Sequence, residues 1–216
     1  MVFSNAQWMT PPASGSVVSV GNSALFNSAN SEDLSRGSMS GTATTWTASF
    51  WVYRGDNGQR GDATAKMMFT TASDAGLSFG DNSTADVLAW YSGSYTATTR
   101  LFRDVGWYHM VVKNVAGTGI VYVNGDIVLF GLTVPTADAT MAIGSYNNSS
   151  SHLDGYMAEW VFIDGTALEP TSFAGYDSTG TFWTPLASAT IKALTFGTNG
   201  FYLDNTTNAQ TDASGE

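Results

Sequence analysis

The feature that most constrains this chain is a pair of apolar runs separated by two residues. Ile120 to Val123 and Ile127 to Phe130 are rich in β-branched and aromatic residues, and Asn124-Gly125 lies between them. Both central residues of a type I′ turn need a positive φ, which Asn and Gly tolerate, and this turn fits the twist of two antiparallel strands. Trp107 to Lys113 supplies a third strand, joined through Gly117-Thr118-Gly119. The stretch therefore predicts a three-stranded antiparallel meander.

Further strands are predicted along the chain, separated by turns rich in Gly, Asn, Asp and Ser. In the run 45–53, alternate residues fall on one face of a strand, and we expect that face to point to the core. These inward residues are Trp46, Ala48, Phe50 and Val52. The other predicted strands are 17–20, 23–26, 66–71, 76–80, 86–91, 98–102, 140–145, 156–163, 191–196 and 200–203. So many short strands, with no repeat of about 40 residues, predict an all-β, antiparallel two-sheet sandwich and not a propeller.

The chain divides into three parts. Residues 1–15, with Pro11-Pro12, are interpreted as an N-terminal extended arm, residues 16–205 as the β domain and residues 206–216 as a polar C-terminal tail. One domain is expected because sandwiches run to about 200–250 residues as single units. The chain has no cysteine, and a core of this size needs no disulfide. Pro170 suits the first position of a short helical turn.

The charge balance argues against two classes of partner. The net charge is −10, and the 8 Lys and Arg residues are scattered along the chain. Binding to nucleic acid or to an anionic membrane needs clustered cations, so neither is expected. The sequence contains no run of about 18 apolar residues, so membrane insertion is not expected either.

The N-terminus lacks the basic and apolar regions of a secretory signal, although the composition resembles that of an extracellular surface. A virion protein would combine these features, because it is made in the host cytoplasm and exposed only later. We therefore expect the protein at the virion surface.

Four segments form an ordered pattern: Trp107 to Val112, Val121 to Gly125, Ile143-Gly144 and Leu153 to Glu159. The pattern resembles the laminin-G-like and pentraxin-like domains of the concanavalin A-like lectin/glucanase superfamily. This resemblance implies a jelly roll of two curved sheets. Ala158 stands where the family usually has Asp, so no polar role is carried over to that position.

A narrower resemblance spans residues 20–205. It rests on Phe26 to Ala29 with Leu34 to Arg36, on Trp46 to Arg54, on Phe162 to Leu168 and on Gly197 to Asp204. These segments resemble lectin-like domains of bacteriophage structural proteins, which occur in tail fibres and capsid decoration. The resemblance implies a non-enzymatic virion surface protein, expected as a homo-oligomer, with other virion proteins and host-surface glycans as partners. The alternative is a free carbohydrate-binding module or a degenerate glucanase.

Hydrolysis of glycosidic bonds has to be weighed, because the superfamily includes glucanases. A retaining site needs two carboxyl groups about 5–5.5 Å apart, which laminarinase-type members place as Glu-x-Asp-x-x-Glu on one strand. The glutamates here are Glu32, Glu159, Glu169 and Glu216, and none has a partner at that spacing. We predict that the protein is not an enzyme, and we interpret Glu159 as a structural group hydrogen-bonded under a loop.

The candidate sugar-binding residues are aromatic side chains at strand ends and in loops, together with polar neighbours. Aromatic faces pack against the C–H surfaces of sugars, and amides and carboxylates bind their hydroxyls. The candidates are Trp90, Tyr91, Tyr95, Tyr146, Asn147, Asn148 and His152. The alternative is a place in the core or at a subunit interface, where Trp and Tyr are also enriched. The sequence leaves both interpretations open.

Calcium is the one cofactor that the resemblance implies, because many relatives use it to hold a glycan. Hard cations need several oxygen ligands converging from loops. The candidate ligands are Asp81, Asn82, Asp86 and Asp154. Asp and Asn are also the ordinary turn formers of β proteins, and this alternative stays open. His109 lies in mid-strand, and we expect a half-buried strand residue and not a metal ligand.

Overall fold

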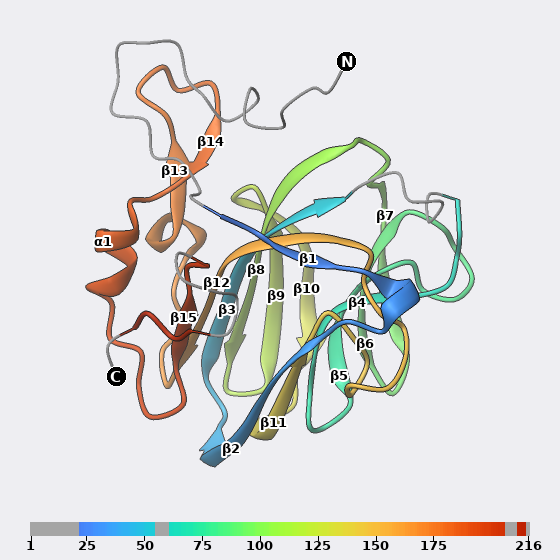
Figure 1. Ribbon diagram of the computed structural model, residues 1–216, viewed down its shortest axis with the longest axis horizontal. Helices are drawn as coiled ribbons and strands as arrows, with labels where there is room; N and C mark the ends of the chain where they lie inside the picture. The colour runs from blue at the N-terminus through green and yellow to red at the C-terminus, as the bar shows by residue number, and fades with distance from the viewer. Residues whose placement is uncertain (1–21, 55–60, 206–210, 215–216) are drawn as a thin grey trace.

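The computed structural model of the protein describes residues 22–54, 61–205 and 211–214. Two antiparallel sheets pack face to face (Figure 1). The strand order of the first sheet is β1-β12-β3-β8-β9-β10, with β15 also paired to β12, and that of the second is β2-β11-β4-β5-β6-β7. The predicted all-β, antiparallel jelly-roll sandwich is confirmed.

The first sheet comprises β1 (Ala24–Phe26), β3 (Trp46–Arg54), β8 (Gly106–Val115), β9 (Thr118–Val123), β10 (Asp126–Thr133), β12 (Gly155–Asp164) and β15 (Phe201–Leu203). The second comprises β2 (Leu34–Ala43), β4 (Lys66–Thr71), β5 (Ala75–Phe79), β6 (Val87–Ser92), β7 (Tyr95–Leu101) and β11 (Ala137–Ile143). A separate hairpin is formed by β13 (Ala174–Tyr176) and β14 (Trp183–Pro185). Short helical turns occur at η2 (Ser28–Asn30), η3 (Pro170–Ser172) and α1 (Ser188–Lys192).

The predicted meander is present as β8, β9 and β10, which neighbour one another in the first sheet. At the turn between β9 and β10, φ is 51° at Asn124 and 87° at Gly125. Both values lie in the left-handed region that a type I′ turn requires. The short helical turn at Pro170 is also confirmed.

The main core lies between the two sheets and is built on aromatic rings. Phe50, Trp160 and Phe201 stack in series, with ring centroids 5.4 and 5.5 Å apart. Phe69, from the second sheet, meets Phe50 and Trp160 edge-on. The residues predicted to point inward from β3 are fully buried in this core, namely Trp46, Ala48, Phe50 and Val52. Offset and edge-on aromatic pairs add to the stabilisation given by buried area.

The outer face of the first sheet is buried as well, which alternation alone does not predict. Thr47, Ser49 and Trp51, on the other face of β3, are also buried. The segment after β12, which holds the β13–β14 hairpin and α1, packs against this face and forms two further apolar clusters. The domain therefore has a partial third layer, which lies on the left of Figure 1.

The predicted strand at 191–196 is wrong, because α1 extends to Lys192 and residues 193–196 form a turn and irregular structure. Ile191 and Leu194 are three residues apart and both pack into the outer cluster, a spacing that suits a helical turn. Strands β2, β13 and β14 were not predicted, since they lack a clear apolar alternation. The predicted strand 17–20 and the arm 1–15 lie outside the described residues, as does most of the tail. In the part of the chain that is described, no helix is long and apolar enough to span a membrane.

Candidate functional site

A cleft of about 700 Å³ lies between the outer face of the first sheet and the β13–β14 hairpin. We call it the aromatic cleft. Its aromatic lining residues are Trp51, Tyr53, Trp107, Tyr176, Phe182 and Trp183. Its polar lining side chains are Asn124, Asp126, Thr181 and Thr184. Ligand sites in proteins typically combine an apolar, aromatic wall with a few placed polar groups, and this cleft has that composition.

Strand pairing builds the floor of the aromatic cleft. Trp51 and Tyr53 alternate with the inward residues of β3, so their rings point to the outer face. The register pairs Tyr53 with Trp107 and Trp51 with His109 across β3 and β8. The Tyr53 and Trp107 rings are 5.5 Å apart, and the Trp51 ring stacks on the imidazole of His109 at 5.0 Å. The floor is therefore fixed by the sheet.

Trp183 forms a wall of the cleft and is held by a buried hydrogen-bond chain. Its indole Nε1 donates to Nδ1 of His109 over 3.1 Å, and Nε2 of His109 lies 2.9 Å from Oγ of Ser49. Because Nδ1 must accept, the proton of the neutral imidazole belongs on Nε2. Burial lowers the pKa of His109 to about 3, so the ring is neutral near pH 7. The mid-strand position of His109 is as expected, but the residue is only 1% exposed and not half-buried.

The tip of the β13–β14 hairpin forms the side of the aromatic cleft that faces away from the sheet. Oδ1 of Asp177 accepts the backbone N–H groups of Thr181 and Phe182, over 2.9 and 3.0 Å. These bonds lower the pKa of Asp177. Tyr176 and Phe182 are 63% and 58% exposed, so a ligand can contact their side chains.

A second cavity of about 330 Å³ adjoins the aromatic cleft, and we call it the side compartment. The two cavities share four lining residues, Asn124, Asp126, Tyr176 and Trp183. The side compartment is also lined by Tyr122 and Glu169. Glu169 is paired with Lys113 and accepts a hydrogen bond from the hydroxyl of Tyr122 over 3.2 Å.

The turn between β9 and β10 is part of the site, because Trp183 lies against Gly125. A Cβ added at Gly125 would lie 2.9 Å from Cη2 of Trp183. We expect Gly125→Ala to lower the free energy of unfolding by about 1–2 kcal/mol, the cost of a left-handed alanine, and to displace the Trp183 ring. Urea unfolding measures the first effect and near-ultraviolet circular dichroism the second.

Gly93→Ala is the matched control for this substitution. Gly93 also has a positive φ, of 77°, but a Cβ there would meet no atom within 4 Å. Both variants should lose similar stability, while only Gly125→Ala should change the tryptophan signal. Identical near-ultraviolet spectra for the two variants would contradict the packing of Trp183 on the turn.

Three of the sequence-predicted sugar-binding residues come together elsewhere, on the second sheet. The ring of Tyr91 lies 4.9 Å from that of Tyr95 and 6.0 Å from that of Tyr146. All three side chains are partly exposed. Asn147 lies beside them, and its amide donates to Asp74. A saccharide site on this tyrosine cluster stays a prediction.

The remaining predicted sugar-binding residues lie apart from the tyrosine cluster. The amide of Asn148 donates to Oδ1 of Asp33 over 3.1 Å, and Nδ1 of His152 lies 3.7 Å from Oδ2 of the same carboxylate. Trp90 belongs to the core: it is 1% exposed, and its indole N–H donates to the carbonyl of Thr133. A ligand cannot reach Trp90, so the alternative of a core residue applies to it.

Two of the calcium candidates, Asp81 and Asn82, are engaged in hydrogen bonds, and Asp154 lies in a different loop. Oδ1 of Asp81 accepts the backbone N–H groups of Ser83 and Thr84. The side chain of Asn82 accepts from the N–H of Ala65 and donates to the hydroxyl of Tyr95. Within the described ranges, no three His, Asp or Glu side chains form a group that could hold a metal ion.

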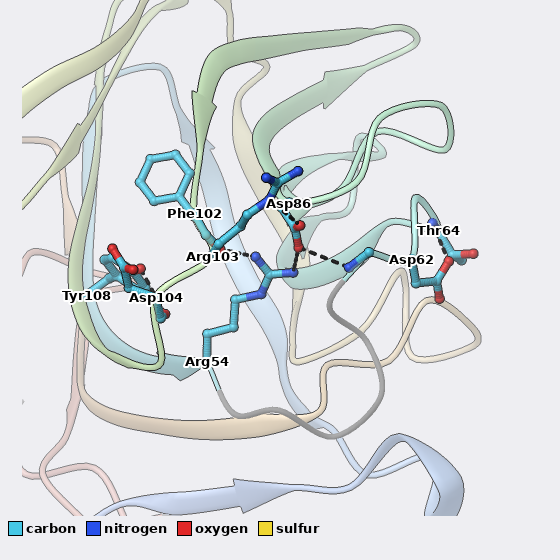
Figure 2. Close-up of polar contacts among 9 residues, drawn as sticks. Arg54, Asp62, Thr64, Asp86, Phe102, Arg103, Asp104 and Tyr108 are labelled. Carbon is cyan, nitrogen blue, oxygen red and sulfur yellow. Dashed lines mark hydrogen bonds and ion pairs between the residues drawn. The ribbon is translucent and has the colours of Figure 1, made fainter.

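Asp86 is committed to two arginines (Figure 2). Its Oδ1 lies 2.5 Å from the guanidinium of Arg54 and its Oδ2 lies 3.1 Å from Nε of Arg103. Burial alone would raise the pKa of Asp86, but hydrogen bonds from Arg54, Gly61 and Arg103 outweigh it and lower the pKa. Positive charge already occupies both carboxylate oxygens, so Asp86 has a structural role and is not free to bind calcium.

Glu159 lies outside the aromatic cleft, on the same outer face. A bulge in β12 gives it a φ of 52° and turns its side chain toward β15. Its Oε2 accepts the hydroxyl of Tyr202, and burial raises its pKa to about 7. The expected hydrogen bond is present, although the partner belongs to a strand and not to a loop.

The sequence of residues 26–172 matches the model of a family described as the concanavalin A-like lectin/glucanases superfamily. No curated protein matches the chain. The match begins at the last residue of β1 and ends with η3, so it covers the strands of both sheets from β2 to β12 but not β15 or the β13–β14 hairpin.

Solved structures share the fold at low sequence identity. The crystal structure of a candidate carbohydrate binding protein from Bacteroides ovatus is similar over 85% of this chain and 53% of its own, with a TM-score of 0.60 and 16% identity. This chain thus spans about half the length of that protein. Domain 4 of AbnA, a GH43 extracellular arabinanase from Geobacillus stearothermophilus, gives a TM-score of 0.49 at 19% identity over 69% and 73% of the two chains. Trypanosoma rangeli sialidase gives 0.45 at 17% identity over 59% and 21%.

Proposed function

We propose that this chain, which belongs to the concanavalin A-like lectin/glucanase superfamily, is a carbohydrate-binding domain that holds a saccharide in the aromatic cleft. The observation that carries the proposal is the convergence of six aromatic and four polar side chains on one cavity. The apolar C–H faces of a sugar ring can pack on the indole and phenol rings, while its hydroxyls bond to the polar groups. The similar Bacteroides ovatus protein, described as a candidate carbohydrate binding protein, is in line with this role.

The proposed role is binding without hydrolysis. Acid–base cleavage of a glycosidic bond needs a pair of carboxyl groups, about 5–5.5 Å apart for retention or 6.5–9.5 Å for inversion. Among the described residues that line the aromatic cleft, Asp126 is the sole carboxylate. Glu169 lines only the side compartment, where Lys113 neutralises it. Release of reducing ends from any bound oligosaccharide would contradict this part of the proposal.

Phe182→Ala tests the site with little risk to the fold, because this ring is largely exposed on the hairpin tip. We expect affinity for a bound oligosaccharide to fall by roughly fivefold or more, since truncating a side chain that carries binding energy costs more than about 1 kcal/mol. Isothermal titration calorimetry measures the effect, on an oligosaccharide first identified with a glycan array.

Phe130→Ala is the matched control, since Phe130 is 77% exposed on β10 and does not line the cleft. Its affinity should equal that of the unmodified protein. If instead Tyr146→Ala abolishes binding and Phe182→Ala does not, the saccharide site is the tyrosine cluster on the second sheet.

We also propose that the domain is carried on a bacteriophage particle, as a decoration or fibre component with other virion proteins as neighbours. The support for this location is the resemblance of Phe26 to Ala29, Trp46 to Arg54 and Gly197 to Asp204 to lectin-like phage domains. Mass spectrometry of purified particles tests it: the chain should be present in a fixed stoichiometry. Its absence from intact particles would favour a free carbohydrate-binding module.

A further inference from the structure

We infer that the ligand of the aromatic cleft is an uncharged oligosaccharide, selected against acidic sugars and long enough to occupy the side compartment as well. This inference rests on the proposed carbohydrate-binding function and names the class of saccharide. It follows from the charge of the lining and from the side chains that the two adjoining cavities share.

The described lining offers no cationic partner to an anionic sugar. None of the described residues that line either cavity is a lysine or an arginine. Lys113 is paired with Glu169, and its side chain is only 11% exposed. Arg103, two residues before the lining residue Val105, is paired with Asp86. Carboxylate recognition in proteins usually relies on such cations, and here they are either buried or already paired.

Asp126 adds a specific bias against acids. It is exposed and lines both cavities. A carboxylate can only accept hydrogen bonds, so it can bind a sugar hydroxyl but repels a sugar carboxylate. At a separation of about 4 Å, repulsion between two such charges costs about 1 kcal/mol even at the dielectric constant of water, and more beside a protein surface. The net charge of −10 acts in the same direction.

The two cavities adjoin each other and share part of their lining. Trp183, Asn124, Asp126 and Tyr176 line both of them. Trp183 can therefore present its ring to a sugar in the aromatic cleft, while the edge of the same side chain borders the side compartment. The buried His109 fixes this orientation through the indole N–H. A chain of several sugar residues can fill both spaces, whereas a monosaccharide fills only part of the larger.

A panel of defined saccharides tests the inference on the full chain. The panel holds glucan, xylan, mannan, galactan and arabinan oligosaccharides of one to six residues, with oligogalacturonate, oligomannuronate and sialyllactose as acidic members. We expect at least one neutral series to bind, with affinity rising from one residue to three. We expect acidic members to bind at least about tenfold more weakly, the change that corresponds to 1.4 kcal/mol.

Two further measurements test whether charge causes the weaker binding of the acidic saccharides. In Asp126→Asn, the difference between neutral and acidic members should shrink, while the melting temperature stays the same. In the unmodified protein, added salt should shrink the same difference, because salt screens exposed charges. The salt titration keeps the test valid even if the variant folds poorly.

The outcomes are distinguishable. An acidic member bound as tightly as the best neutral one, or a monosaccharide bound as tightly as its trisaccharide, would overturn the inference and leave the proposed function standing. Tighter binding of a cationic amino sugar, tested as chitosan oligomers, would also overturn it. Silence across the whole panel would count against the proposed function itself, and the inference would fall with it.

Discussion

Asp86→Ala is expected to lower the free energy of unfolding by about 3–5 kcal/mol, the usual cost of removing one partner from a buried ion pair. The guanidinium of Arg54 would be left buried without its carboxylate, since the two side chains are only 8% and 4% exposed. Arg54 also donates to the carbonyl of Phe102 and lies over the ring of Phe79, 4.8 Å from its centroid. The pair thus ties β3 of the first sheet to the second sheet and to the loop before β8 (Figure 2).

Two variants isolate the charge from other effects. Asp86 has a φ of 64°, a conformation that Asn adopts more readily than Ala, so Asp86→Asn removes the charge with less backbone strain and should cost less. Asp62→Asn removes a partner from the exposed Asp62–Lys66 pair, where the atoms are 3.7 Å apart, and should change stability by less than about 1 kcal/mol. Urea unfolding compares all three. If Asp86→Ala lowers the free energy of unfolding no more than Asp62→Asn does, the structural role of the Arg54–Asp86 pair is refuted.

The sandwich and its inner core were predictable because they depend on local alternation. The run from Trp46 to Val52 places large apolar side chains at every second position, and the Asn124-Gly125 turn sets the register of its hairpin. The Arg54–Asp86 pair was not predictable, because these residues are 32 positions apart and meet only when the two sheets close. From the sequence, Asp86 was predicted as a calcium ligand, with an ordinary turn former as the alternative.

The aromatic cleft was missed for a related reason. It forms where the β13–β14 hairpin packs on the outer face of the first sheet, and nothing local to either segment specifies that contact. One feature of the sequence indicates it: Trp51 and Tyr53 are large aromatic residues on the face of β3 that was expected to point away from the core. A second is the short segment Tyr176 to Trp183, in which an Asp-Ser-Thr-Gly turn is flanked by aromatic residues. Aromatic residues on both faces of a strand indicate that a further layer covers it.

The tyrosine cluster could be predicted from the sequence only in part. Tyr91 and Tyr95 flank one turn and face each other in the β6–β7 register, so their proximity follows from the hairpin. The approach of Tyr146 depends on the loop after β11 and could not be derived locally. Trp90, the neighbour of Tyr91, necessarily points to the other face of β6, which is the core.

Stability should depend on pH through the buried His109 and the partly buried Glu159, which act in opposite directions. The pKa of His109 is lowered from 6.5 to about 3 by burial, so its contribution to stability is present above pH 6.5 and is lost as the pH falls toward 3. The pKa of Glu159 is raised from 4.5 to about 7, chiefly by burial, so its contribution is present below pH 4.5 and is lost as the pH rises toward 7. Between pH 4.5 and 6.5 the two slopes, each about 1.4 kcal/mol per pH unit, cancel.

Glu159→Gln should therefore expose the titration of His109. Glutamine can still accept the hydroxyl of Tyr202, but it does not titrate, so one of the two slopes disappears. We expect the free energy of unfolding of this variant to rise by roughly 2 kcal/mol from pH 4.5 to 6.5, while that of the unmodified protein stays level. Urea unfolding at closely spaced pH values within this window measures both curves, and most other carboxylates have finished titrating there. Parallel curves for the two proteins would show that Glu159 ionises as freely in the folded chain as in the unfolded one. A flat curve for Glu159→Gln would show the same for His109, and the buried, neutral imidazole that fixes Trp183 would then have to be abandoned.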